Sequence, residues 1–190
     1  MPAEVFNHVT LSALFRYWDK KRADRAMPAR RDIDPIEMGP KLLPHLMLCE
    51  LSDHADRIRF RLVGTFLVKR LGYDPTGHWL SELPKSDYLD SLAKALRQTY
   101  AEASPLYAAS SFRWGAKSRL DAHHVFLPLT SGSGTEPAIV LVGTTYVSEE
   151  VFPPQIRTLD TMAQHHVGKR EILATTLAQA RRDVKSAIVA

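Results

Sequence analysis

The residues of this 190-residue chain with the widest chemical repertoire are its eight histidines. A metal site needs ligands that converge, most simply two histidines at positions i and i+4 of one helix. His123 and His124 are neighbours on an expected strand and face opposite sides, while His165 and His166 are neighbours on an expected helix, about 100° apart. The lone His78 is more typical of a hydrogen-bonded or surface residue than of a ligand. We therefore predict no metal site.

Cysteine and serine are the other candidate reactive residues. Cys49 is the only cysteine, which excludes an intramolecular disulfide and a thiolate zinc cluster within one chain. Its apolar neighbours predict a small buried residue of a core strand. Ser110 and Ser111 on one expected strand could approach His123 or His124 on the next, but a nucleophile also needs a base that a third group orients. The sequence indicates no such set, so we predict that the chain is not an enzyme.

The overall composition is typical of a globular domain with one substantial core. Hydrophobic residues make up 45% of the chain and charged residues 24%. No apolar run reaches the roughly 18 residues that a membrane helix needs. The first residues, with Glu4 and no basic flank, do not resemble a secretory signal. We expect a cytoplasmic protein without membrane insertion.

Basic residues are concentrated near the N-terminus, although the formal net charge of the chain is only +4. Such a cluster could contact nucleic acid, an anionic lipid surface or an acidic partner. Because no aromatic interleaving or DNA-reading motif accompanies it, a solvated helix face and linker is the favoured interpretation, and nucleic-acid binding is not expected. The cluster consists of Arg16, Lys20, Lys21, Arg22, Arg25, Arg30 and Arg31, against Asp19 and Asp24.

Alternation of polar and apolar residues predicts an antiparallel sheet. The clearest example runs from Arg57 to Leu62, where arginines at every second position alternate with Ile58, Phe60 and Leu62. The expected strands are 45–51, 57–63, 106–114, 119–129 and 138–147.

Helical spacing predicts helices before, within and after this sheet. Residues 8–25 carry an apolar stripe, 87–103 form a long helix, and Thr65 can cap a short helix that ends at Gly72. From Pro153-Pro154 to the end the pattern predicts one long helix with a seam of nearly heptad spacing. The seam consists of Leu173, Leu177, Ala180, Val184 and Ile188.

These elements and their local motifs resemble a known family. The strand end RLVGT at 61–65, the turn GYDPTG at 72–77, Trp18 and the segment from Met27 to Leu51 together resemble the PAS domain of a proteobacterial family of single-PAS-domain proteins, over roughly residues 10–147. The resemblance implies an α+β fold: a five-stranded antiparallel sheet with short helices and one long helix on one face, flanked by N- and C-terminal helices. We expect an N-terminal amphipathic helix and basic linker over 1–34, the PAS-like core over 35–150 and a C-terminal helix over 151–190.

The resemblance also implies where a ligand would bind: between the long helix, the loop around Trp79 and the concave face of the sheet. Haem-binding PAS sensors place a histidine on the long helix, and flavin-binding light sensors carry an asparagine-cysteine-arginine motif after the second strand. This long helix has no histidine and Cys49 lies on the first strand, so no cofactor is expected. The candidate pocket residues are Phe60, Leu62, Trp79, Leu92, Leu96, Phe112, Phe126 and Val140, with Tyr88, Tyr100 and Arg113 as polar contacts; simple core packing is the alternative for all of them.

In function, the resemblance implies a stand-alone signalling protein that acts as a homodimer, either as a small-molecule sensor or as a protein-interaction adaptor. A structural or localisation module without ligand is the alternative, and a small α+β enzyme is less favoured. The N-terminal stripe is too apolar to leave in water. The outer face of the chain's own sheet could cover it, but the arginines at 57–61 indicate that part of that face is polar, which favours a partner subunit. We therefore expect the stripe to be the dimer interface, formed by Leu11, Leu14, Phe15 and Trp18.

Overall fold

The alternating segments form an antiparallel sheet, as predicted. The computed structural model describes residues 8–114, 118–132, 137–148 and 172–176, and there the strand order is β2-β1-β5-β4-β3, with β6 beyond β3. Each of the first five strands lies within one residue of its predicted bounds at either end. They are β1 Leu46–Ser52, β2 Arg57–Val63, β3 Leu106–Trp114, β4 Ser118–Thr130 and β5 Pro137–Ser148.

The sixth strand, β6 at Ile172–Thr176, was not predicted. It pairs antiparallel to β3, with Leu173 opposite Ala109. The prediction of one continuous C-terminal helix is therefore wrong at these residues, whose β-branched Ile172, Thr175 and Thr176 favour a strand despite the helical spacing of the leucines. The other predicted seam positions lie outside the described residues.

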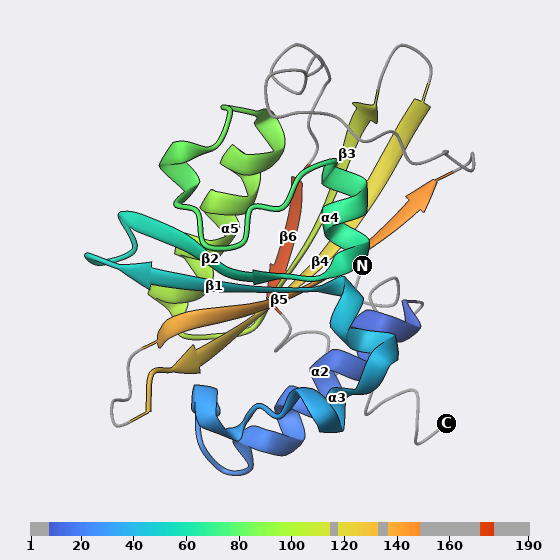
Figure 1. The fold of residues 1–190 in the computed structure, drawn as a ribbon. Coiled ribbons are helices and arrows are strands. Elements are labelled where there is room, and N and C mark those ends of the chain that lie inside the picture. The colour runs from blue at the N-terminus through green and yellow to red at the C-terminus, as the bar shows by residue number, and fades with distance from the viewer. Residues whose placement is uncertain (1–7, 115–117, 133–136, 149–171, 177–190) are drawn as a thin grey trace.

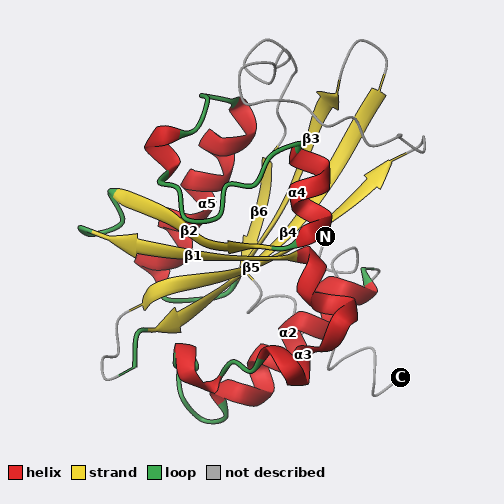
Figure 2. Ribbon diagram, viewed as in Figure 1, coloured by secondary structure: helices red, strands yellow, loops and turns green. Residues whose placement is uncertain are grey.

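Two layers of helix cover the two faces of the sheet (Figures 1 and 2). The outer layer, blue in Figure 1, contains α2 Val9–Arg22, η1 Arg30–Asp32, α3 Pro35–Leu42 and η2 Leu43–His45. The inner layer, on the opposite face, contains α4 Thr65–Leu71, η3 Leu80–Glu82 and the long helix α5 Asp87–Glu102. This arrangement confirms the α+β fold of a five-stranded sheet with one long helix on one face.

Local sequence signals explain where the helices begin and end. Asp34 caps α3 by accepting a hydrogen bond from the Ile36 amide at 2.8 Å, and Ser86 caps α5 through the Leu89 amide at 3.2 Å. For α4 the predicted cap, Thr65, is wrong by one residue: Gly64 is at the capping position, and Thr65 is the first residue of the helix. Its predicted end at Gly72 is confirmed, with a left-handed φ of 81°.

The sheet separates two hydrophobic cores. The inner core lies between the sheet and the layer of α4 and α5, and it includes Phe60, Leu92, Leu96, Phe126 and Val140. The outer core lies between the other face and the layer of α2 and α3, and it includes Leu11, Leu14, Phe15, Trp18, Val125, Leu127 and Leu141.

The predicted dimer stripe belongs to the outer core. Leu11, Leu14, Phe15 and Trp18 are between 0% and 6% exposed within a single chain, and the Trp18 indole Nε1–H donates to the Pro128 carbonyl at 2.9 Å. Gly143 of β5 lets the helix approach, since a Cβ there would collide with the Leu14 side chain. The four residues are thus covered by their own sheet, so the prediction that they form the dimer interface is wrong and the alternative of burial on the sheet is correct. The polar arginines of β2 do not oppose this burial, because α2 packs on β4 and β5.

A β-bulge changes which side chains of β2 face inward. Cys49 pairs with Phe60 and Leu48 with Leu62, so Arg61 is the extra residue. The bulge reverses the alternation, which leaves Leu62 47% exposed and buries Val63. The prediction that Leu62 lines the inner face is therefore wrong.

Candidate functional site

Most of the predicted pocket residues do lie together in the inner core. Phe60, Leu92, Leu96, Phe126 and Val140 are all at most 3% exposed. Tyr88 and Tyr100 of α5 pack against them and are partly exposed. The structure thus brings α5 and three strands of the sheet to one place, as expected.

Trp79 is not among them. Residues 77–79 pair with the free edge of β2, where the Phe60 amide donates to the His78 carbonyl at 3.0 Å. This pairing leaves the Trp79 ring beside two arginines, with the Cζ of Arg57 4.0 Å and that of Arg59 5.6 Å from the ring centroid. Leu83, rather than Trp79, is the residue of this loop that is buried in the inner core. The side chains of Phe112 and Arg113 lie outside the described part of the structure.

A polar pair lies inside the inner core and was missed from the sequence. His124 of β4 and Thr144 of β5 are directly opposite in the register, and the His124 Nδ1 lies 2.9 Å from the Thr144 Oγ1. Both are buried, at 4% and 0% exposure. A signal for His124 was present, because a strand that turns Phe126 inward must turn His124 to the same face.

Two tyrosines extend this pair toward the surface. The ring of Tyr88 lies 5.8 Å from that of His124, and the Tyr88 and Tyr146 hydroxyls are hydrogen-bonded to each other. Phe66 of α4 stands 6.1 Å from the Tyr146 ring. We call Tyr88, His124, Thr144 and Tyr146 the inner polar cluster.

Burial keeps every titratable group of this cluster uncharged. It lowers the pKa of His124 to about 3 and raises the pKa of Tyr146 to about 12, and it raises the pKa of Tyr88 well above its ordinary value. The nearby Cys49 thiol has its pKa raised to about 12 for the same reason. The cluster therefore offers neutral hydrogen-bonding groups and no charge.

The lowered pKa of His124 makes a testable prediction about acid stability. The unfolded chain binds a proton at this residue near pH 6.5, whereas the folded chain does so only near pH 3. Between these values the unfolded state binds more protons, so stability falls as the pH falls. We expect wild type to lose up to about 1.4 kcal/mol of unfolding free energy per pH unit between pH 6 and 4, relative to His124→Phe. Urea denaturation across this range measures it.

The exposed histidine His54 provides the control for this measurement. His54→Asn should keep the pH dependence of wild type, because this substitution removes an exposed histidine and leaves the buried His124 in place. If His124→Phe lost stability with acid as steeply as wild type, the buried neutral state of His124 would be wrong.

The opposite face of β4 carries a second polar group. His123 points toward α2, as the predicted alternation requires, with its Nδ1 2.6 Å from the Tyr107 hydroxyl and its ring 4.1 Å from that of His8. Ser111 hydrogen-bonds to Asp121 on the neighbouring strand. Among the described residues, no group of three or more histidine, cysteine or acidic side chains is placed to hold a metal ion.

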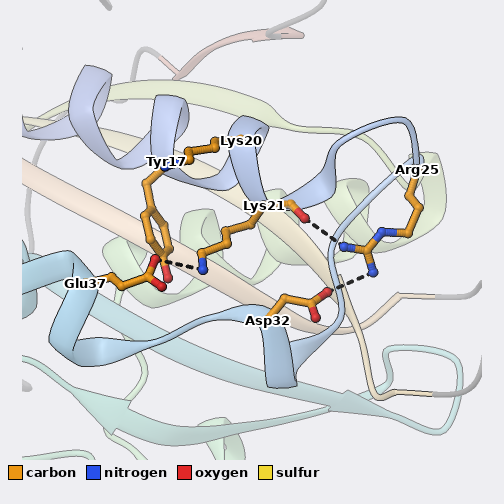
Figure 3. A pocket seen from close by; sticks show the side chains of 6 residues that line it. All are labelled: Tyr17, Lys20, Lys21, Arg25, Asp32 and Glu37. Carbon is orange, nitrogen blue, oxygen red and sulfur yellow. Dashed lines mark hydrogen bonds and ion pairs between the residues drawn. The ribbon is translucent and has the colours of Figure 1, made fainter.

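Three residues of the basic cluster near the N-terminus, Lys20, Lys21 and Arg25, line an open surface hollow of about 620 Å³ (Figure 3). Lys21 pairs with Glu37 at 2.7 Å, and Arg25 pairs with Asp32 at 2.8 Å. The hydrogen bond to Glu37 raises the pKa of Lys21, while the Ala29 amide lowers the pKa of Asp32. These pairs tie the end of α2 to the linker and to α3. The hollow is lined by Tyr17, Lys20, Lys21, Arg25, Asp32 and Glu37.

Comparison with protein families gives one match: the family model described as a PAS domain matches residues 6–144. Neither the comparison with curated proteins nor the comparison with solved structures gave a match. In the described residues, no helix has the length and apolar character that crossing a membrane requires.

Proposed function

The chain belongs to the PAS domain family, and on that premise we propose that it is a signalling protein whose inner core binds a small molecule. PAS domains are in general sensory and regulatory. The binding place is the space between α4, α5 and the sheet, around the inner polar cluster. A cytoplasmic location is part of the proposal, supported by the composition and the single cysteine.

One observation carries the proposal: a hydrogen-bonded histidine and threonine lie buried in a core that is mainly apolar. Burying a polar group costs free energy that its hydrogen bonds only partly recover, and an apolar pair of similar shape would stabilise the fold equally well. Residues that stabilise the core less than apolar residues would are expected at sites where a protein binds a ligand or catalyses a reaction. A cluster of neutral donors and acceptors at the inner face of a PAS sheet is suited to ligand recognition.

A matched pair of variants tests this function. Thr144 and Thr145 are neighbours on β5 that face opposite sides, and among the described residues the Thr145 Oγ1 is buried without a hydrogen-bond partner. Thr144→Val removes a bond to His124, whereas Thr145→Val removes none. Native mass spectrometry of freshly purified protein should show a noncovalent ligand mass on wild type and on Thr145→Val, and less of it on Thr144→Val.

Two results together would contradict the proposal. They are a wild type of bare chain mass, and a melting temperature that no compound of a broad metabolite panel raises. The absorption spectrum of the same sample reports any chromophore.

An adaptor role is the second candidate, and the outer face of β1 and β2 favours it. There Leu62 of β2 is 47% exposed, and the Trp79 ring lies against Arg57 of the same strand; tryptophan and arginine are enriched at the centres of protein interfaces. Homodimerisation stays part of the proposal, through a surface other than the buried α2 stripe. Sedimentation of wild type and of Leu62→Glu tests whether a dimer forms through this face. A dimer formed through this face dissociates in the variant, whereas a dimer formed through another surface does not.

A further inference from the structure

The interior of the domain offers a ligand no opposite charge. The buried polar residues in the described part of the chain are serine, threonine and histidine, and none is an aspartate, glutamate, lysine or arginine. A carboxylate or an ammonium group moved from water into such a site loses several kcal/mol of hydration without a partner to replace it. The inner core therefore discriminates against ions.

A cation, Arg70, lies at the edge of this cluster, against two aromatic rings. The Arg70 guanidinium of α4 lies 5.5 Å from the centroid of the Phe66 ring and 6.0 Å from that of Tyr146. It contacts ring faces and not His124 or Thr144. A charge bound at Arg70 would thus remain at the edge, away from the buried pair.

Aromatic rings surround the polar groups. His124 has the rings of Tyr88 and Phe126 each at 5.8 Å, and Phe66 has those of His45 and Tyr146 at 4.3 and 6.1 Å. Separations of this size are those at which rings attract one another in offset or edge-to-face geometry. Surroundings of this kind favour contact with an aromatic ligand over contact with an aliphatic one.

One hydrogen-bonding position of the cluster is open. Neutral imidazole has two ring nitrogens, one a donor and the other an acceptor. The His124 Nδ1 is engaged with Thr144, and no hydrogen bond to Nε2 is found among the residues that the structure describes. Among the described residues, only the Thr145 Oγ1 is a buried side-chain polar atom without a hydrogen-bond partner, so the His124 Nε2 stays accessible to a group the size of a water molecule although His124 as a whole is 4% exposed.

From the uncharged interior, the surrounding rings and the open His124 nitrogen together, we infer that the ligand of the inner core is an uncharged aromatic molecule with a phenol-type hydroxyl, which hydrogen-bonds to His124. This inference deepens the proposed function and rests on it. A hydroxyl suits the site because it can donate or accept, whichever tautomer His124 adopts. Burial supports the same chemistry, since it holds His124 neutral.

Four probes that share one ring test the inference: 4-methylphenol, 4-hydroxybenzoate, 4-hydroxybenzylamine and toluene, at pH 7.5. Titration calorimetry or protein-observed NMR on the full chain should give saturable binding of 4-methylphenol. The anion and the cation should bind at least about tenfold more weakly because neither finds a counterion, and toluene about fivefold to tenfold more weakly because it makes no hydrogen bond.

Variants place the binding in the inner core. Thr144→Val and Tyr88→Phe should weaken 4-methylphenol binding about fivefold to tenfold, and Thr145→Val should not change it. Tyr88→Phe removes one hydroxyl at the partly exposed edge, so it serves if Thr144→Val does not fold. Equal weakening by Thr145→Val would overturn the assigned site.

The remaining outcomes separate the two proposals. If the charged probes bind as tightly as 4-methylphenol, the inferred ligand class is wrong while the site stands. If no probe binds but purified wild type carries a noncovalent ligand, the class is again wrong and the function stands. If no probe binds and no ligand is carried, both are wrong.

Discussion

Trp18→Ala is expected to lower the free energy of unfolding by about 3–5 kcal/mol, the usual loss for removing a large buried aromatic side chain. Trp18 is 1% exposed in the outer core, stacks on Phe15 at 6.2 Å and donates to the Pro128 carbonyl. The substitution leaves a cavity between α2 and the sheet and removes the hydrogen bond to the Pro128 carbonyl. Urea denaturation followed by circular dichroism measures the change.

Arg16→Ala on the exposed side of α2 is the control and should alter stability by less than about 0.5 kcal/mol. The outcome also decides between the buried stripe and the dimer interface predicted from sequence. A Trp18→Ala variant as stable as wild type, but shifted from dimer to monomer in sedimentation, would place the stripe between subunits after all.

Gly64→Ala should be nearly as damaging, at about 3 kcal/mol or more, although the φ and ψ of Gly64, −67° and 150°, suit any residue. A Cβ at this position would lie well inside 3.0 Å of the carbonyls of Leu43 and Pro44. These carbonyls are backbone atoms, and the Gly64 amide is itself hydrogen-bonded to the Leu46 carbonyl at 2.8 Å. Neither the backbone at Gly64 nor the backbone at Leu43 and Pro44 can therefore move apart easily. Thermal and urea denaturation measure the loss.

Thr65→Ala, at the next residue, is the matched control for Gly64→Ala. Thr65 is exposed and does not cap α4, so its replacement should be nearly neutral. A Gly64→Ala protein with wild-type stability would show that η2 can move away from the start of α4.

The elements could be predicted from the sequence because alternation and helical spacing are local properties. The strands at 57–63 and 106–114 match the structure at both ends. The orientation of Leu62 could not be predicted, because the bulge at Arg61 depends on how β2 pairs with β1. The strand at 172–176 was missed because helical spacing over five residues does not outweigh β-branched side chains and pairing with β3.

The misplaced dimer interface has a different cause. The arginines of β2 indicate that only part of the outer face is polar, and β4 and β5 contain continuous apolar runs, Val125–Leu129 and Ala138–Val142. Such runs are typical of strands covered on both faces. This signal could have placed α2 on its own sheet. The meeting of His124 with Tyr88 depends on how α5 crosses the sheet, which no local pattern specifies.

Gly143 and Thr144 bring β5 into contact with both faces of the sheet. One is packed under Leu14 of α2, and the next belongs to the inner polar cluster. Because Gly143 has no side chain, the side chains of Leu14 and Leu11 pack directly on the backbone of the strand. A ligand that moved β5 by a few tenths of an ångström at Thr144 would therefore move the backbone on which α2 packs. The sheet would then carry a displacement from its inner face to the helix on its outer face.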